Sequence, residues 1–541
     1  MGITLQAETY DNVPNTNQLS TAHRDKKLTL KFLQKLFIIA LALFLTACAT
    51  VDFDAPKSAS QAITDTADTR IGRMFAHYAD KPKNESGFYI VTDSIDALAV
   101  RLLMAKWAER SIDAQYYMIN NDIIGKVFFD SLLRAADRGV RVRLLIDDIN
   151  TGGMEHKLAG LTDHPNIELR LFNPFANRGV RAFDAWDFGR INRRMHNKSF
   201  TVDNQITVIG GRNIATEYFA ANNEYNFGDL DTLAVGPVVR DTSRMFDVYW
   251  NHRNAIPYQQ LSGQKKDDGR RLQAVRDTLE DNADTLRDTP YAVAVRDSLE
   301  EFVDGEDKKF SWAPYQLVFD SPDKSLGKKE AEEAPGIMTP LLRSVRSAQE
   351  SLLVVSPYLV PFSSAATGYE ALQDSGIQID ILTNSLASSD HILVHSGYAS
   401  SRKALLEHGV RLYELRGDLR IDGTRRSGHR KAKSSLHTKA FIVDKHYFFM
   451  GSFNWDPRSA DINTELGIII KSPEIASRLA DRFYARAPEA CYIPFLNDQG
   501  QLRWRASNDG ETEILSKEPD TNAYQRFKAN LGRILPVRSQ L

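Results

Sequence analysis

One short polar pattern occurs twice in this chain of 541 residues, and it constrains the fold more than any other feature. Each copy has a histidine, a lysine on the second position after it and an aspartate further on. The residues are His196, Lys198 and Asp203 in the first copy and His437, Lys439 and Asp444 in the second. A glycine turn and an asparagine follow at the same offset in both. Two such copies predict two similar half-sites that converge on one anionic group, for which a phosphodiester is the best fit.

The surrounding sequence repeats in the same order. Helical patterns at 94–108 and 338–347 each precede an apolar strand pattern, at 112–119 and 352–355. Alternation of helices and strands favours an α/β sheet, and an internal repeat favours two such units in one chain. We therefore predict an α/β fold of two domains packed as a pseudo-twofold pair.

Composition shifts divide the chain into six parts. The charged stretch after 259 has apolar residues at helical spacing, and the last apolar residues, Tyr524, Phe527 and Leu531, are also spaced for a helix. That last pattern suits an interfacial helix or a helix packed on the domain. The predicted boundaries are 1–47 for a signal peptide, 48–85 for a tether, 86–258 for the first domain, 259–310 for a helical connector, 311–495 for the second domain and 496–541 for a C-terminal tail with the interfacial helix.

The N-terminal segment predicts a membrane anchor. Its apolar run, 36–45, is shorter than the about 20 residues of a bilayer-spanning helix, and basic residues precede it, as in a secretory signal. The ending Leu45-Thr46-Ala47-Cys48 resembles the lipobox of bacterial lipoproteins. We therefore expect lipidation of Cys48 and a lipoprotein of the bacterial cell envelope, facing the periplasm. The alternatives are an uncleaved interfacial anchor and a buried helix.

Charge and cysteine content exclude other classes of protein. The net charge of −2 gives no overall basic field that would recruit nucleic acid, so anion binding must come from local patches. Cys48 and Cys491 are the only cysteines, which excludes a disulfide scaffold.

The repeated motif suits phosphate and not a metal ion. A cationic lysine two residues from a histidine is a poor neighbour for a metal, and the family of metal ligands is His, Cys, Asp and Glu. Lysine binds phosphate as a flexible point charge. We predict substrate binding by Asn213, Ser452 and Asn454 next to the lysines, with no metal and no cofactor.

The two histidines remain for nucleophilic and proton-transfer work. One imidazole can attack phosphorus while the other donates a proton to the leaving oxygen. An acid on the far ring nitrogen would fix the tautomer, and we assign this role to Asp231 and Glu465, with a structural role as the alternative. For Asp203 and Asp444, a turn or structural role is an equal alternative to a catalytic one.

The duplicated motif, with Gly451-Ser452-Phe453-Asn454, resembles the phospholipase D superfamily. The text around His196 and the segments at 456–459 and 463–465 are similar to bacterial cardiolipin synthases of the C type, over roughly residues 86–495. The resemblance implies two phospholipase D-like domains and a metal-free phosphatidyltransferase that makes cardiolipin from two phospholipids. It further implies His196 as the nucleophile, through a phosphatidyl-histidine intermediate, and His437 as the general acid. Gly211 departs from the superfamily pattern, which often has serine there.

The choice of substrate depends on the anchor. Basic segments before both motifs, the first interleaved with aromatic residues, suit a membrane interface and also single-stranded nucleic acid. Attachment through Cys48 would place the enzyme at phospholipid, so we predict membrane phospholipids and the membrane surface as partners and expect no nucleic acid. The alternatives are a phospholipase D that releases phosphatidic acid, a secreted nuclease of the same superfamily, and a non-catalytic lipid-binding protein.

Overall fold

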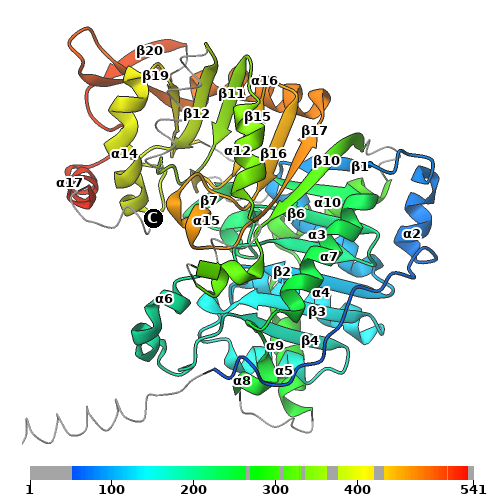
Figure 1. Ribbon diagram of the computed structural model, residues 1–541. Helices are drawn as coiled ribbons and strands as arrows, with labels where there is room; N and C mark the ends of the chain where they lie inside the picture. The colour runs from blue at the N-terminus through cyan, green and yellow to red at the C-terminus, as the bar shows by residue number, and fades with distance from the viewer. Residues whose placement is uncertain are drawn as a thin grey trace, which may run out of the picture. The chain divides into compact units, whose positions relative to one another are not determined.

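The structure is a computed structural model (Figure 1), and the residues that it describes are 51–262, 269–304, 310–327, 329–330, 336–361, 376–419, 432–508 and 510–533. The predicted signal peptide and Cys48 lie outside these ranges. Within them, no helix has the length and apolarity needed to cross a membrane. Residues 52–175 and 187–541 form one compact unit, and 176–186 belong to another, in which Asp184 accepts hydrogen bonds from the backbone of Ala176 and Asn177.

The first half builds a mixed sheet. Its strands, in spatial order, are β9 (Ala255–Pro257), β4 (Ile167–Phe172), β3 (Arg141–Asp147), β2 (Ser111–Tyr116), β5 (Ser199–Val202), β6 (Ile206–Gly210), β8 (Asp231–Val235) and β1 (Glu85–Val91). Strands β2, β3 and β4 run parallel, and every other pairing in this series is antiparallel.

The second half repeats this order in mirror sequence. Its strands are β10 (Ser311–Phe319), β17 (Leu466–Lys471), β16 (Tyr447–Gly451), β15 (Ala440–Val443), β11 (Ser351–Val355), β12 (Gln378–Asn384) and β13 (Arg411–Leu415). Because β10 pairs with β1, the described strands join into one 18-stranded sheet with the junction at its middle. The predicted pair of α/β domains is confirmed.

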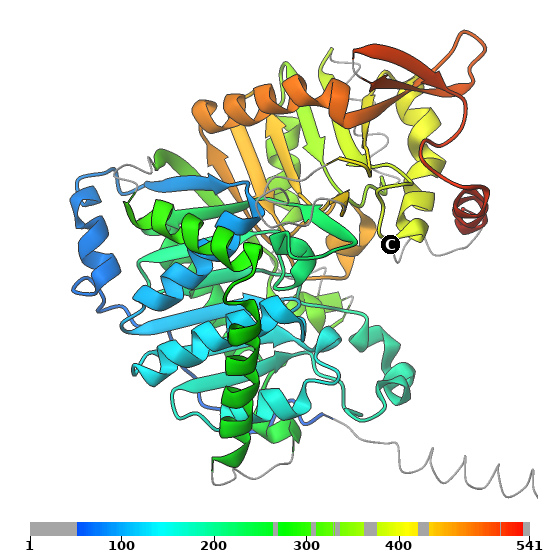
Figure 2. The same ribbon diagram turned by 180° about the vertical axis from the view of Figure 1, so that it is seen from behind.

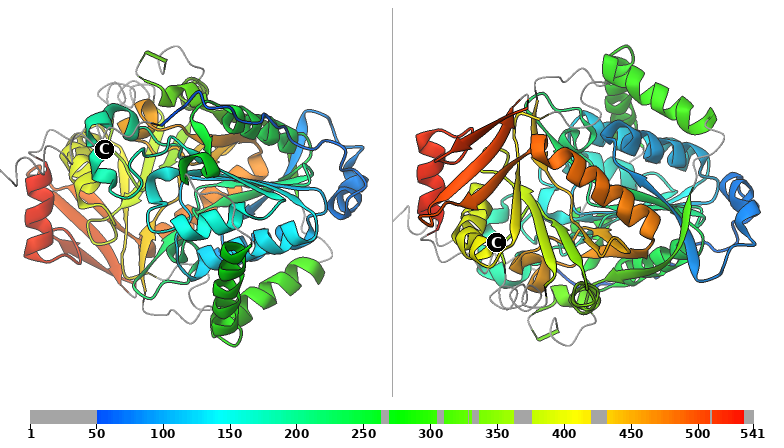
Figure 3. Two further views of the ribbon diagram at one scale, coloured as in Figure 1. Left: turned by 90° about the horizontal axis from the view of Figure 1, so that it is seen from below. Right: turned by 90° about the horizontal axis from the view of Figure 1, so that it is seen from above.

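Helices cover both faces of each half. The helices of the first half are α3 (Ser94–Trp107), α4 (Ile123–Asp137), α5 (Glu155–Thr162), α6 (Phe188–Ile191) and α7 (Pro237–Asn251), and those of the second are α12 (Met338–Arg346), α14 (Ile392–Glu407), α15 (Pro457–Asp461) and α16 (Pro473–Ala490). Neighbouring residues of a strand face opposite sides. Leu144 accordingly packs in the core under α3 and α4, and Leu145 in the core under α7. In the second half α16 lies across the strands on the face opposite α12 and α14 (Figure 3).

The connector is helical, as predicted, and it packs on the first half. It consists of α8 (Tyr258–Ser262), α9 (Arg270–Leu286) and α10 (Pro290–Asp304). Figure 2 shows α9 and α10 in green beside α3 and α4. Val275 and Leu279 are buried in the first-half core, while the charged residues between them face outward.

The prediction of a tether at 48–85 is wrong for its described part. The Lys57 ammonium group donates hydrogen bonds to the carbonyl oxygens of His252 and Arg253 at 2.7 and 2.8 Å. The carbonyl of Ser60 accepts from the buried Arg143 at 3.0 Å. Further on, α2 (Arg70–Phe75) forms. The polar residues of this segment satisfy buried polar groups of the first half, so their composition resembles that of a linker although they are ordered.

The C-terminal tail is also more structured than predicted. After β18 (Cys491–Leu496), which extends the sheet next to β13, β19 (Leu502–Asn508) and β20 (Glu511–Leu515) form a hairpin. The last described element, α17 (Ala523–Gly532), is the predicted helix, and it packs on α14 through the buried Ala529. Tyr524, Phe527 and Leu531 remain 63%, 63% and 50% exposed on its outer side.

Candidate active site

Each motif histidine is held by the backbone of the opposite half. The His196 amide donates to the carbonyl of Thr464 at 2.8 Å, and the His437 amide donates to the carbonyl of Gly228 at 2.8 Å. A short parallel pair, β7 (Tyr225–Gly228) with β14 (Lys433–Leu436), leads the second contact. Both motif segments therefore enter their strands, β5 and β15, at the junction between the halves.

The acids that contact the histidines are exchanged between the halves. His196 Nδ1 lies 2.9 Å from Glu465 Oε2, and His437 Nδ1 lies 2.7 Å from Asp229 Oδ2. Glu465 belongs to the second half and Asp229 to the first, and both carboxylates are buried. Each acid holds the far nitrogen of its imidazole and leaves Nε2 for chemistry, which is the arrangement that fixes a tautomer.

The assignment of Asp231 as a histidine-orienting residue is wrong. Its carboxylate lies 2.9 Å from Arg101 and 3.2 Å from Arg212, and all three side chains are buried. Asp231 therefore compensates two buried guanidinium groups, which would be costly to leave unpaired. The residue that sequence reasoning missed is Asp229.

A local signal for Asp229 was present in the sequence. Asp229-Leu230 and Glu465-Leu466 are both an acid followed by leucine. Strand register places them identically, because Gly210 pairs with Asp231 and the equivalent Gly451 pairs with Gly467. Counting back two residues from each partner gives Asp229 in one half and Glu465 in the other.

Both motif lysines are buried beside the histidines. Lys198 and Lys439 each donate to the carbonyl of the histidine two residues earlier, and Lys439 Nζ also lies 2.9 Å from His437 Nδ1. Burial lowers the pKa of Lys439 to about 8 and lowers the pKa of Lys198 well below its usual value. An entering phosphate would favour the charged form of both groups.

Burial also lowers the pKa of both histidines. The pKa of His196 falls to about 4, although the neighbouring Glu465 carboxylate acts in the opposite direction. That of His437 falls well below its usual value, through burial and the positive charges of Lys439 and Lys198. The mutual influence of these four groups places the two half-sites at one centre, and the neutral imidazoles suit nucleophilic attack.

The two carboxylates have different electrostatic surroundings. Burial alone would raise the pKa of Glu465, but His196, Lys198 and a hydrogen bond from Ser452 outweigh it, so the pKa is lowered. For Asp229 burial dominates and the pKa is raised. The His196 half-site thus has the more firmly ionised acid.

The structure places Asp203 and Asp444 in turns and not in the site, which corrects their catalytic assignment. Asp203 accepts hydrogen bonds from the backbone of Arg110 and Ser111 at 2.8 and 2.9 Å, and Asp444 accepts in the same way from residues 349–351. The strand between Lys198 and Asp203 separates them by roughly 16 Å, at about 3.3 Å per residue. Both aspartates fix the β-hairpin turn of their half to the start of the neighbouring strand.

The predicted substrate-binding residues surround the histidines. Ser452 donates to Glu465 and therefore supports the acid of His196. Asn213 and Asn454 hold equivalent places in the two halves, and the amide oxygen of each is buried without a hydrogen-bond partner among the described residues. An unsatisfied buried polar group is costly, so a matched pair of them indicates a polar ligand.

Gly211 faces the acid of the other half-site. A Cβ atom at Gly211 would lie 2.4 Å from Asp229 Oδ1, so glycine makes room for the carboxylate that contacts His437. The equivalent Ser452 instead bonds to its acid. The difference between the repeats is thus part of how each acid is seated.

Three tyrosines next to the histidines were not predicted. The Tyr218 hydroxyl lies 3.4 Å from His437 Nε2 and accepts from Asn213 at 3.0 Å. The ring of Tyr117 stands edge-on to His196, and that of Tyr358 edge-on to His437. Tyr117 and Tyr358 each follow the strand that pairs with a motif strand, β2 or β11, which is the one sequence signal for them.

Among the described residues, no group of three or more His, Cys, Asp and Glu side chains is arranged to hold a metal ion. Comparison with known proteins decides the family. The family model "Cardiolipin synthase, PLD-like domain" matches residues 102–250 and 341–486. Cardiolipin synthase C of Escherichia coli K12 is 39% identical over 84% of this chain and 96% of its own length.

The chain belongs to the cardiolipin synthase family of phospholipase D-like proteins. The two matched segments of this family member carry one motif each, and it is a phosphatidyltransferase of the phospholipase D superfamily, as predicted. An uncharacterized protein of Helicobacter pylori 26695 is 31% identical over 93% of the chain and 99% of its own length. The crystal structure of phosphatidylserine synthase from Haemophilus influenzae Rd KW20 shares the fold, with a TM-score of 0.54 and 13% identity over 84% of this chain and 95% of that one.

Proposed function

We propose that this enzyme forms cardiolipin by transferring a phosphatidyl group from one phospholipid to another. The observation that carries the proposal is the exchanged pair of buried histidine–acid contacts, with a lysine beside each. Two neutral imidazoles and two lysines around one centre suit the displacement of an alcohol from a phosphodiester. The 39% identity to a cardiolipin synthase supports phospholipids as donor and acceptor.

In the first step, His196 Nε2 attacks phosphorus and the bond to the leaving alcohol breaks. The Nδ1 proton stays hydrogen-bonded to Glu465, whose lowered pKa favours the carboxylate that stabilises the forming cation. His437, once protonated, gives its proton to the leaving alkoxide. The product of this step is a phosphatidyl-histidine and a free alcohol.

The second step reverses the roles of proton donor and acceptor. The hydroxyl group of a second phospholipid gives its proton to His437 and attacks phosphorus, and the bond to His196 breaks. Lys198 and Lys439 stabilise the phosphate oxygens in both steps. His196 as the nucleophile is favoured by its more firmly ionised acid.

The proposal is tested with purified enzyme and vesicles of phosphatidylglycerol, with lipid products identified by mass spectrometry. We expect cardiolipin from the wild type and none from His196→Ala. His446→Ala is the matched control, because His446 is exposed in the β15–β16 turn. Release of phosphatidic acid in place of cardiolipin would make the enzyme a hydrolase, and cleavage of DNA without lipid turnover would make it a nuclease.

We also propose that the enzyme is a lipoprotein of the bacterial cell envelope that faces the periplasm and acts at the membrane surface. The lipobox-like sequence at Cys48 supports the anchor. The outward Tyr524, Phe527 and Leu531 of α17 support direct contact with lipid. Labelling with radioactive palmitate tests the anchor, since Cys48→Ala should abolish incorporation, and label retained by this variant would rule out Cys48 as the site.

A further inference from the structure

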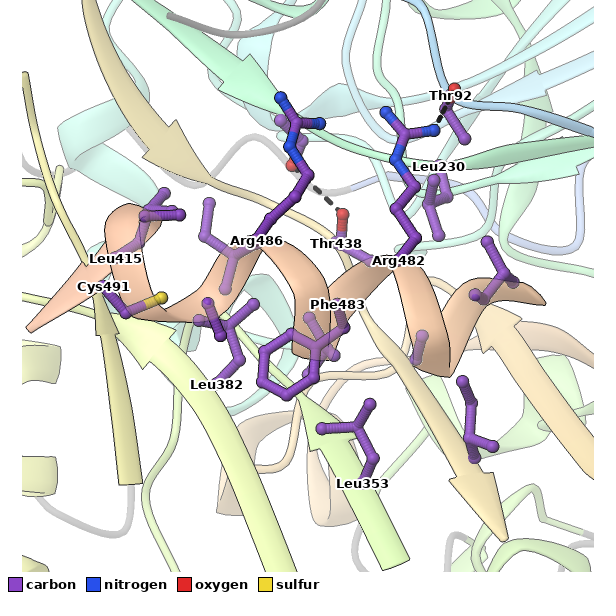
Figure 4. A pocket seen from close by; sticks show the side chains of 18 of the residues that line it. Thr92, Leu230, Leu353, Leu382, Leu415, Thr438, Arg482, Phe483, Arg486 and Cys491 are labelled. Atoms are coloured by element: carbon purple, nitrogen blue, oxygen red, sulfur yellow. Dashed lines mark hydrogen bonds between the residues drawn. The ribbon is translucent and has the colours of Figure 1, made fainter. Parts of the chain in front are cut away.

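The second half contains a hollow where the first half has a packed core. The cavity has a volume of about 430 Å³, lies between α16 and the sheet, and is mostly apolar (Figure 4). This volume is in the range of pockets that bind small molecules, roughly 300–1,000 Å³. Its apolar wall includes Leu353, Leu382, Leu415, Leu436 and Phe483.

The wall formed by the sheet matches the first-half core position by position. Asp147 pairs with Phe172 and, at the same register, Asn384 pairs with Leu415. Phe172 is buried in the core under α7, whereas Leu415 lines the hollow. Leu145 and Leu382 correspond in the same way. The hollow is therefore the second-half counterpart of the core under α7.

The helix explains why this counterpart is empty. Helices α7 and α16 both begin with proline, at Pro237 and Pro473, after equivalent strands. Counted from these prolines, the buried residues Phe246, Tyr249 and Trp250 of α7 correspond to Arg482, Ala485 and Arg486 of α16. Three aromatic rings that fill the first half are thus replaced by two arginines and an alanine.

The two arginines give the hollow a cationic side. Arg482 and Arg486 lie one helical turn apart and both line it. Figure 4 shows their guanidinium groups on the side of α16 away from Leu353 and Leu382, with Arg482 next to Thr92, at 3.3 Å. Glu489 and Asp229 are the acids of the lining, and Asp229 is engaged with His437. An apolar floor with arginines at one edge is complementary to an acyl chain joined to a phosphate.

The hollow lies directly behind the His437 half-site. Thr438 and Ala440 line it, and they alternate along the chain with His437 and Lys439, which face the site. A ligand in the hollow therefore contacts the back of the catalytic segment and cannot be the lipid that reacts. We propose that the hollow binds one accessory phospholipid, with an acyl chain against the leucines and its phosphate at Arg482 and Arg486. The proposal rests on the proposed function only in taking phospholipid as the available ligand.

The test uses photo-crosslinking of the full chain with a phosphatidylglycerol that carries a diazirine on one acyl chain. We expect crosslinks in peptides containing Leu382 and residues 473–491. Ala485→Tyr restores the ring of the first half and should remove these crosslinks. The double variant Arg482→Gln/Arg486→Gln should need roughly tenfold more probe for the same labelling, because about one charged hydrogen bond is lost. Arg478→Gln, on the same helix outside the lining, should behave as the wild type.

Several outcomes would overturn the proposal. These are labelling confined to other peptides, equal labelling of the wild type and both pocket variants, and equal labelling by a diazirine diacylglycerol, which lacks the phosphate. Since Ala485→Tyr alone could disturb folding, the double glutamine variant, at two exposed positions, decides independently. The wild type is assayed for cardiolipin formation in parallel. If that reaction is absent, the proposed function fails while the labelling still tests the hollow.

Discussion

Asp229 and Asp231 are two residues apart and perform different tasks. Asp229 contacts His437, while Asp231 pairs with the buried Arg101 and Arg212. Asp229→Asn should lower kcat/KM by about 10²–10⁴, since the imidazole loses the acceptor that fixes its tautomer. Asp231→Asn should instead lower the free energy of unfolding by about 3–5 kcal/mol, because it leaves buried guanidinium groups without a counter-charge.

Steady-state kinetics and thermal unfolding of the two variants separate these effects. Kinetics are measured well below the unfolding temperature of each variant. If Asp229→Asn kept the wild-type kcat/KM, the proposed part of Asp229 in orienting His437 would be incorrect.

The lowered pKa of Lys439 predicts how the reaction depends on pH. Below about pH 8 the free enzyme carries a protonated Lys439, and above it the ammonium charge is lost. We therefore expect kcat/KM to fall as the pH rises through about 8, because kcat/KM reports groups of the free enzyme. Lys439→Arg, which keeps its charge, should move this decline to higher pH. A pH profile that is flat to pH 10 in the wild type would contradict the assignment.

At the scale of elements, the two β-hairpins of the motifs depend on an aspartate at each turn. The Asp203 carboxylate accepts backbone hydrogen bonds from the loop before β2. Asp203→Asn should reduce the free energy of unfolding by about 1–3 kcal/mol, as expected when bonds to a charged acceptor are weakened. Activity of the folded variant should stay near that of the wild type. Urea titration with parallel kinetics tests both expectations, and a loss of kcat without a loss of stability would restore Asp203 to the catalytic residues.

Elements with a periodic apolar pattern were predictable from the sequence, and elements held by polar contacts were not. The alternating helices and strands and helix α17 follow from their spacing of apolar residues. The segment around Lys57 and Ser60 is polar because it bonds to buried carbonyl and guanidinium groups, so it reads as a linker. The β19–β20 hairpin buries Trp504 among polar neighbours and was likewise missed.

The candidate site shows the same division. The repeated motif gave the histidines and lysines, because a motif is local in sequence. The exchange of acids was not predictable, because it depends on how the two halves pack. For the same reason the tyrosines around His437 could be found only in the structure.

At the scale of the whole molecule, α17 presents an apolar face on the second half. We expect Tyr524→Ser/Phe527→Ser/Leu531→Ser to bind anionic vesicles at least tenfold more weakly, since burial of each large apolar side chain contributes about 1.5–3 kcal/mol at most. The comparison is made in a Cys48→Ala background, so that the proposed lipid anchor does not mask the effect. Cosedimentation with vesicles gives the affinity.

Activity toward a water-soluble, short-chain substrate is the control for this variant, and it should be unchanged. Equal cosedimentation of the variant and its parent would exclude α17 as a membrane contact.

The exchange of acids across the β1–β10 junction couples the two half-sites mechanically. A small rotation of one half against the other would stretch the His196–Glu465 and His437–Asp229 contacts together. Neither half-site can be loosened while its partner stays intact, so the reaction is enabled or disabled as a unit. A covalent lipid intermediate is then never left beside a proton donor that has drifted out of reach.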